Sequence, residues 1–111
     1  MENEGFTASA ERTTSGWKIV LTGTVDRNAK DDMEHAYDET VGQDGEVVFD
    51  FNQVDYINST GIAVIVGILA RARSESRQMG AVGLTDHYRE VFQITRLSDF
   101  MHIYEDAPSA N

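Results

Sequence analysis

The chain contains no cysteine, a single proline and only two lysines among its 111 residues. Without cysteine it can form neither a disulfide framework, nor a thiol nucleophile, nor a cysteine metal site. The one proline, Pro108, falls within residues 105–111, which we expect to be a frayed tail, so no interior linker is predicted. The first residues also lack the basic and apolar regions of a secretory signal, and we therefore expect a cytoplasmic location.

Long hydrophobic runs and basic residues are also scarce. The longest uncharged internal stretch, Tyr56–Ala70, is shorter than the roughly 20 apolar residues that a membrane span needs. Nine basic residues against 19 acidic ones give a net charge of −10, which argues against nucleic acid or an anionic membrane as the ligand. Residues 1–58 hold 13 of the acidic residues and four of the basic ones, which predicts an acidic surface formed by the first half. The predicted ligand is a protein.

The length suits one domain over residues 1–111, with a core of about 6–104. Two short runs of partial alternation predict an N-terminal hairpin, and apolar residues at helical spacing from Ala29 to Val41 predict the first helix. The remaining expected elements are a strand at 47–51, a helix at about 59–79, a strand at 81–84, a helix capped by Asp86 and a weak last element at 100–104. This order predicts an α/β fold, a mixed sheet of four to five strands with one face thinly covered by helices.

The junction between the strand at 47–51 and the following helix draws attention because three small polar residues, Asn58, Ser59 and Thr60, stand at the helix start. Unpaired N–H groups and the positive end of the dipole lie there, so a hydroxyl could accept a phosphoryl group whose charge is partly offset. The helix itself is apolar nearly all round from Ile62 to Ala70, and we expect it to be buried there. Its glycines, Gly61 and Gly67, predict close packing or access to the backbone at the motif.

The sequence also allows other interpretations of Asn58, Ser59 and Thr60. Asn58 and Ser59 are both good helix caps, which is a purely structural role. Asn58–Thr60 matches a glycosylation sequon, but a chain without a secretory signal does not normally meet that machinery. A serine hydrolase would need a G-x-S-x-G turn, which is absent, and a base near Ser59. The histidines, which are expected at the surface, are His35, His87 and His102.

Two further chemistries are weighed against the residues. Asp31, His35 and Glu39 could share a helix face and hold a metal, although acidic helix faces are usually only solvated. Asp50 could be a phosphoaspartate of a receiver-like domain, but such domains also need a late lysine, and the only lysines here are Lys18 and Lys30. With no phosphate-binding or dinucleotide motif either, we expect no enzyme activity, no cofactor and no resident metal.

The motif Asn58-Ser59-Thr60-Gly61 after the strand at 47–51, with Gly23-Thr24-Val25-Asp26 upstream, resembles the STAS domain of bacterial anti-sigma factor antagonists from about Phe6 to Tyr104. The signature of that family is an Asp-Ser-Ser/Thr-Gly run and an upstream Gly-Glu-Leu-Asp. The resemblance implies that Ser59 is the phosphorylated serine, Thr60 the second hydroxyl, Gly61 the turn residue and Asp26 the acid that closes the upstream motif. This chain departs from the signature in having Asn58 for Asp and Thr24-Val25 for Glu-Leu.

The resemblance implies a partner switch. The unmodified domain, a monomer or weak homodimer, would bind an anti-sigma factor that is also a serine kinase of the histidine-kinase-like ATPase type, through Asp26, Asn58, Ser59, Thr60 and Gly61. Binding would free a sigma factor, phosphorylation of Ser59 would end it, and a phosphatase would reset the domain. The alternative is a scaffold module of a larger signalling or transporter-associated complex without reversible phosphorylation.

Overall fold

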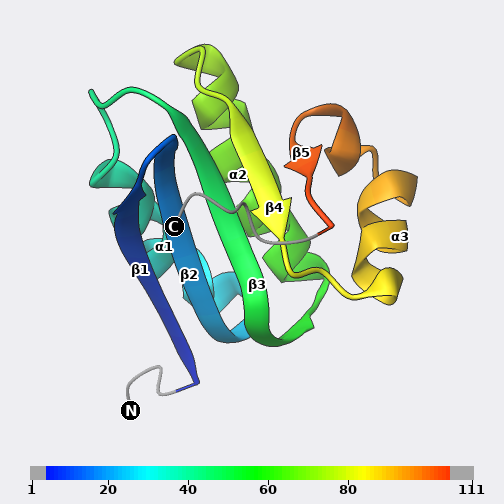
Figure 1. Cartoon of the computed structure of the whole chain (residues 1–111). Coiled ribbons are helices and arrows are strands. Elements are labelled where there is room, and N and C mark those ends of the chain that lie inside the picture. The colour runs from blue at the N-terminus through cyan, green and yellow to red at the C-terminus, as the bar shows by residue number, and fades with distance from the viewer. Residues whose placement is uncertain (1–4, 106–111) are drawn as a thin grey trace.

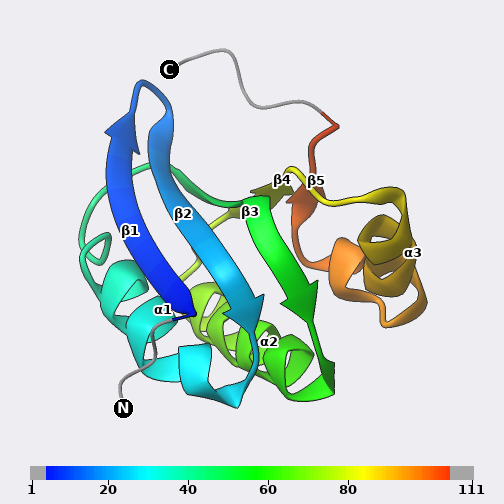
Figure 2. The same ribbon diagram turned by 90° about the horizontal axis from the view of Figure 1, so that it is seen from below.

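A computed structural model, which describes residues 5–105, has one mixed five-stranded sheet with three α-helices (Figures 1 and 2). The expected α/β fold is confirmed. The predicted tail at 105–111 lies outside the described residues except for Glu105. The elements in chain order are β1 (Phe6–Thr13), β2 (Gly16–Val25), the 3₁₀ helix η1 (Arg27–Ala29), α1 (Lys30–Asp38), β3 (Glu46–Ile57), α2 (Ser59–Ser74), β4 (Met79–Val82), α3 (Asp86–Ile94), the 3₁₀ helix η2 (Leu97–Asp99) and β5 (His102–Ile103).

The strands lie in the sheet in the same order as in the chain, β1-β2-β3-β4-β5. β1 and β2 form the predicted antiparallel hairpin, and every later pair is parallel. The connections through α1 and α2 place both helices on one face of the sheet, while α3 lies beyond the β5 edge (Figure 2). The prediction that helices would cover one face thinly is therefore confirmed.

The core lies between the sheet and the helices α1 and α2. Apolar side chains of the inner strands meet Met33 and Tyr37 of α1 and Ile65 and Ile68 of α2, and all four are almost fully buried. Their burial follows the predicted helical spacing, which places them on the faces turned to the sheet. Val41, predicted on the same face, is instead 43% exposed, because α1 ends at Asp38 and the buried residue of the following turn is Thr40.

The strand β3 is longer than the predicted strand at 47–51, and the short loop expected after Phe51 is wrong. β4 pairs only with Val47–Asp50, whereas the rest of β3 pairs with β2 alone, through two register shifts. Because this overhang has one neighbouring strand, side chains such as Asn52 and Asp55 stay exposed and conceal the strand in the sequence.

The helix α2 differs from its prediction at its end and on its outer face. It ends at Ser74 rather than near Met79, because Ser76 adopts a left-handed conformation, φ 57°, and the N–H of Arg77 donates to the carbonyl of Ala72 at 2.8 Å. This is a Schellman cap built without glycine. The expectation of burial all round is also wrong, since Ala63, Val66, Gly67 and Ala70 are exposed.

The last elements differ from prediction by a few residues. β4 begins at Met79 rather than 81, and the cap of α3 is Thr85, whose hydroxyl accepts from the N–H of Tyr88 at 3.2 Å, so Asp86 is the first helical residue. The weak last element expected at 100–104 is the two-residue strand β5.

Candidate functional site

The two motifs singled out in the sequence meet at the carboxyl ends of β2 and β3. Val25 and Ile57 are paired at the ends of these parallel strands, so Asp26 and Asn58 follow them at the same edge of the sheet. The N–H of Asn58 donates to the carbonyl of Val25 at 3.2 Å, which joins the two segments directly. In Figure 2 this edge is the region where β2 and β3 end and α2 begins.

Asn58 is the cap of α2. Its backbone is extended, with φ −98° and ψ −177°, and its Oδ1 accepts from the N–H of Gly61 at 2.8 Å. The same oxygen accepts from the hydroxyl of Thr60, also at 2.8 Å. Of the two cap candidates in the sequence, Asn58 therefore takes the role, and Ser59 becomes the first helical residue.

Thr60 and Asp26 hold the loop after β2 against α2. The Thr60 hydroxyl accepts from the N–H of Arg27 at 3.2 Å while it donates to Asn58. The carboxylate of Asp26 accepts from the N–H of Asn28 at 2.9 Å and so caps η1. The polar atoms of these two residues already have partners within the chain, which makes them positioning residues of the junction.

Gly61 lets α2 approach the end of β2. A Cβ at this position would lie 2.0 Å from the carbonyl oxygen of Val25, a distance that no side chain can adopt. The prediction of close packing is therefore confirmed for Gly61. It is wrong for Gly67, where a Cβ would meet no atom within 4 Å.

Ser59 is exposed at the start of α2, and its hydroxyl makes no hydrogen bond to any residue of the described part of the chain. The side chains of its neighbours, Asn58 and Thr60, are engaged in hydrogen bonds. The one free hydroxyl of the motif is therefore that of Ser59, which the resemblance marks as the phosphoacceptor. A macromolecule that approaches this edge of the sheet can reach it.

The three histidines, which the sequence offers as bases, are on other elements. His35 is in α1, His87 stacks edge-on against Tyr88 at 4.8 Å between ring centroids, and His102 stacks on Tyr104 at 4.1 Å. None of the three histidines is therefore among the residues of the junction between β2, β3 and α2.

Asp50 lies within β3 rather than at its end. Its carboxylate is 4.0 Å from Nζ of Lys18 and accepts from both nitrogen atoms of Asn52 at 2.9 Å. Over residues 5–105, no three His, Asp or Glu side chains are grouped so that they could hold a metal ion, and the structure thus does not assemble Asp31, His35 and Glu39 into a metal site.

Two neighbours of the site were not singled out in the sequence. The hydroxyl of Tyr88 accepts from the N–H of Ile57 at 2.9 Å and so anchors α3 to the residue before Asn58. Arg27 is an exposed cation whose backbone contacts Thr60. The sequence signal for Arg27 is its place after Asp26, whereas the apolar spacing of α3 gives no sign of the contact that Tyr88 makes.

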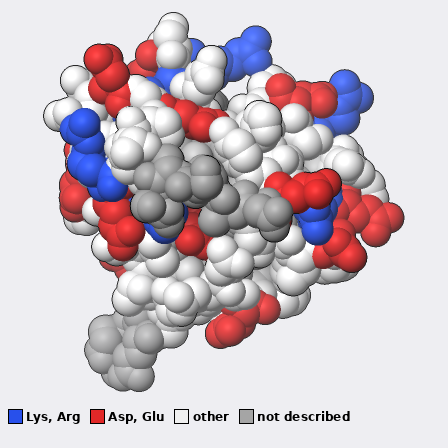
Figure 3. All heavy atoms as spheres, viewed as in Figure 1, with Lys and Arg blue, Asp and Glu red and all other residues white. Residues whose placement is uncertain are grey.

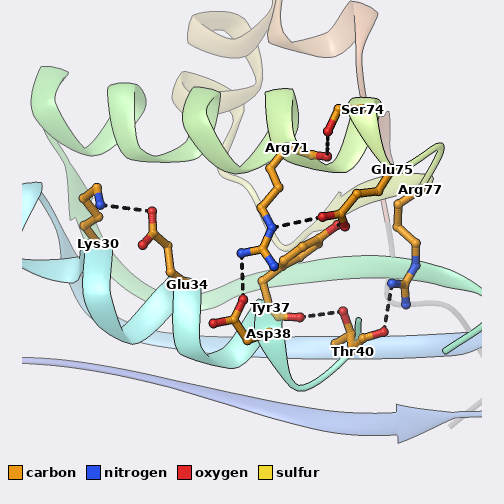
Figure 4. A network of polar contacts seen from close by, with 9 residues as sticks. All are labelled: Lys30, Glu34, Tyr37, Asp38, Thr40, Arg71, Ser74, Glu75 and Arg77. Atoms are coloured by element: carbon orange, nitrogen blue, oxygen red, sulfur yellow. Dashed lines mark hydrogen bonds and ion pairs between the residues drawn. The ribbon is translucent and has the colours of Figure 1, made fainter. Parts of the chain in front are cut away.

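The pKa values of Tyr37, Arg71 and Glu75 are shifted at a place away from this edge, where the end of α1 meets the end of α2 (Figure 4). Burial and a 2.8 Å hydrogen bond to Glu75 raise the pKa of Tyr37 to about 12. The same bond, with one from Arg71, lowers the pKa of Glu75. Arg71 also pairs with Asp38 at 2.7 Å and lies over the ring of Tyr37 at 4.7 Å, so the network fastens the two helices together.

Charge is mixed rather than divided by sign on the described part of the face shown in Figure 3, where acidic and basic side chains lie near one another. The acidic surface predicted for the first half is therefore not a continuous patch on this face. No helix within residues 5–105 is long and apolar enough to cross a membrane.

Comparison with family models and with curated proteins identifies the family. The family model described as "Mlab, STAS domain" matches residues 8–103. A protein of Listeria monocytogenes named anti-sigma-B factor antagonist is 31% identical over 94 residues, which are 84% of this chain and 82% of the relative. A protein of the same name from Staphylococcus aureus is 32% identical over 65 residues, or 57% of this chain and 60% of the relative.

Solved structures have the same fold. An anti-sigma factor antagonist from Mycobacterium paratuberculosis has a TM-score of 0.77 at 18% identity and covers 98% of this chain and 93% of its own. The antagonist SpoIIAA in its unphosphorylated form has a TM-score of 0.68 at 15% identity, with 91% of this chain and 90% of its own covered. At these identities the structures establish the shared fold.

Proposed function

The chain belongs to the STAS domain family of anti-sigma factor antagonists, and from this premise we propose that it binds an anti-sigma factor and releases the sigma factor held by it. The binding surface of the proposal is the edge formed by Asp26, Asn58, Ser59, Thr60 and Gly61. The anti-sigma factor is a serine kinase of the histidine-kinase-like ATPase type, which supplies ATP and Mg²⁺. The chain is a cytoplasmic binding protein, without catalysis or cofactor of its own.

Phosphorylation of Ser59 by this kinase ends binding in the proposed mechanism, and a phosphatase restores it. The observation that supports it is the exposed Ser59 hydroxyl between two side chains whose polar atoms are engaged. A phosphoryl group adds roughly −1.5 to −2 charges. A cost of about 2.7 kcal/mol at an interface lowers affinity about a hundredfold, so one modification is enough for a switch.

The neutral Asn58 is compatible with this mechanism. Its amide oxygen caps α2 through the bond to the N–H of Gly61, as a carboxylate would, without placing a negative charge beside the acceptor. Addition of the dianionic group next to Asn58 therefore meets less repulsion than it would next to aspartate.

Mass spectrometry tests the proposal directly. The purified chain is incubated with the anti-sigma factor kinase of its own organism and ATP, and we expect an acid-stable increase of about 80 Da, one phosphoryl group, that fragment mapping places on Ser59. Ser59→Ala should stay unmodified and keep its affinity for the kinase, while Ser59→Asp should bind at least tenfold more weakly. An acid-labile group on Asp50, or equal binding of the two variants, would contradict the mechanism.

The second candidate, a scaffold module of a larger signalling or transporter-associated complex, is favoured by Asn58, which departs from the signature of the switching proteins. Light scattering after size exclusion separates the two. A monomer or weak homodimer whose binding depends on phosphate supports the switch. A stable high-order assembly, unchanged in Ser59→Asp, supports the scaffold.

A further inference from the structure

An apolar groove lies between the outer face of α2 and the segment at 95–100, away from the edge that carries Ser59. Its volume is about 350 Å³, and its walls include Val66 and Ala70 of α2 with Leu97 and Phe100 opposite. Val66 is 45% exposed and Phe100 51% exposed, so the groove presents two large apolar side chains to the outside. Exposed apolar surface that gathers in a groove is typical of a protein interaction site.

The charge at the rim of the groove indicates what kind of partner fits it. Arg73 lies over the ring of Phe100 at 5.2 Å and has no ion pair with any carboxylate of residues 5–105. By contrast, Arg96 on the same side pairs with Asp99 at 2.7 Å. In a chain with 19 acidic residues, an arginine beside an apolar groove that lacks an acidic partner is complementary to a carboxylate from outside.

The groove is also continuous with the proposed binding edge along one helix face. Ser59, Ala63, Val66 and Ala70 are exposed and recur at helical spacing on α2. The seven residue steps from Ser59 to Val66 correspond to about 10 Å along the helix axis. One partner lying along α2 can therefore contact both Ser59 and the groove.

We infer that the groove receives an apolar side chain from an amphipathic helix of the anti-sigma factor, and that a carboxylate on the same helix pairs with Arg73. The identity of the partner rests on the proposed function, whereas the chemistry of its helix rests on the groove and on Arg73.

Matched variants test the inference in calorimetric titrations of the unmodified chain with the purified anti-sigma factor kinase of its organism. Val66→Asp is compared with Val41→Asp, since Val41 is 43% exposed but lies outside the groove. Arg73→Glu is compared with Arg12→Glu, because Arg12 lies over the ring of Trp17 at the same 5.2 Å. We expect Val66→Asp to weaken binding at least tenfold and Arg73→Glu at least fivefold, with both controls within twofold of wild type.

Additional measurements keep the outcomes separate. Val66→Ser, which removes apolar surface without adding charge, should also weaken binding, and circular dichroism with thermal melts checks that every variant is folded. If Val66→Asp and Arg73→Glu bind like their controls while Ser59→Asp binds weakly, the groove inference fails and the proposed function stands. If the wild type binds no kinase, both fail. A dimer of the chain alone that Val66→Asp abolishes would make a second copy the occupant and overturn the inference.

Discussion

The motif at the start of α2 assigns different tasks to three adjacent polar residues. Asn58 caps the helix, Thr60 binds the loop that follows β2, and Ser59 has no partner of its own within the described chain. The structural roles at this junction therefore belong to Asn58 and Thr60, and the regulatory role that we propose falls to Ser59 alone.

This division predicts the behaviour of variants at position 58. Asn58→Ala removes the acceptor for the N–H of Gly61, so we expect a loss of about 1 kcal/mol in the free energy of unfolding, measured with urea. Asn58→Asp keeps the acceptor and should be within a few tenths of a kcal/mol of wild type. Stability of Asn58→Ala equal to that of wild type would show that the cap is dispensable.

At the scale of the helix, two glycines of α2 should respond oppositely to the same substitution. Gly67→Ala adds a methyl group to an exposed helix interior with open space, and we expect a gain of about 0.5–1 kcal/mol. Gly61→Ala places a methyl group against the carbonyl of Val25 and should destabilise by more than that. Urea unfolding of both variants measures the difference. Equal effects would mean that the end of β2 can move away from α2.

The contact between α1 and α2 predicts a dependence of stability on pH. The pKa of Tyr37 is about 12 in the folded chain against 10.0 for the ordinary group, so the unfolded chain loses this proton first as pH rises. Stability should therefore decrease from about pH 10 to about 12. Tyr37→Phe should lose less stability over this window than wild type, because other groups titrate equally in both. The free energy of unfolding is measured with guanidinium at each pH. If it falls equally with pH in wild type and in Tyr37→Phe, the raised pKa of Tyr37 is contradicted.

The elements show where sequence patterns suffice and where they do not. Apolar spacing identifies the hairpin, the three helices and the buried faces of Met33, Tyr37 and Ile65 because burial against the sheet imposes it. The end of α2 was missed because the left-handed residue that ends it is Ser76 and not a glycine. The overhang of β3 was missed because it has only one neighbouring strand, so most of its side chains stay exposed and polar.

The candidate site was predictable to a similar extent. The motif residues follow parallel strands, so their meeting at one edge could be expected, and the family resemblance marked Ser59 among them. The hydrogen bonds of Thr60 and the anchor from Tyr88 depend on loop conformations and on a helix 31 residues from Ile57, about which local sequence carries no information.

For the molecule as a whole, the net charge of −10 should act on the rate of association with a basic or neutral partner. The chain measures 33 × 31 × 27 Å, which is close to the Debye length of about 30 Å at 0.01 M salt. We expect the association rate constant with the anti-sigma factor, measured by stopped flow, to fall at least tenfold between about 0.01 and 1 M salt.

A charge-reduced variant controls this prediction. Glu39 and Asp44 are exposed and lie after the end of α1, away from the start of α2 that carries Ser59. Glu39→Gln combined with Asp44→Asn should lessen the dependence on salt without loss of folding. A rate that does not change with salt would show that the acidic residues serve solubility alone.

The order of the strands in the sheet, which repeats their order in the chain, has a consequence for how the protein folds. Only the β1–β2 hairpin pairs segments that are adjacent in the chain, whereas the parallel pairs join residues far apart, such as Gly16 with Glu46 and Val47 with Met79. Because a long crossover has to close before such pairs form, we expect the hairpin to form early and the parallel part of the sheet to form more slowly. Because β5 has only two residues and pairs with β4 alone, we expect that edge of the sheet to be the first to open when the native protein fluctuates.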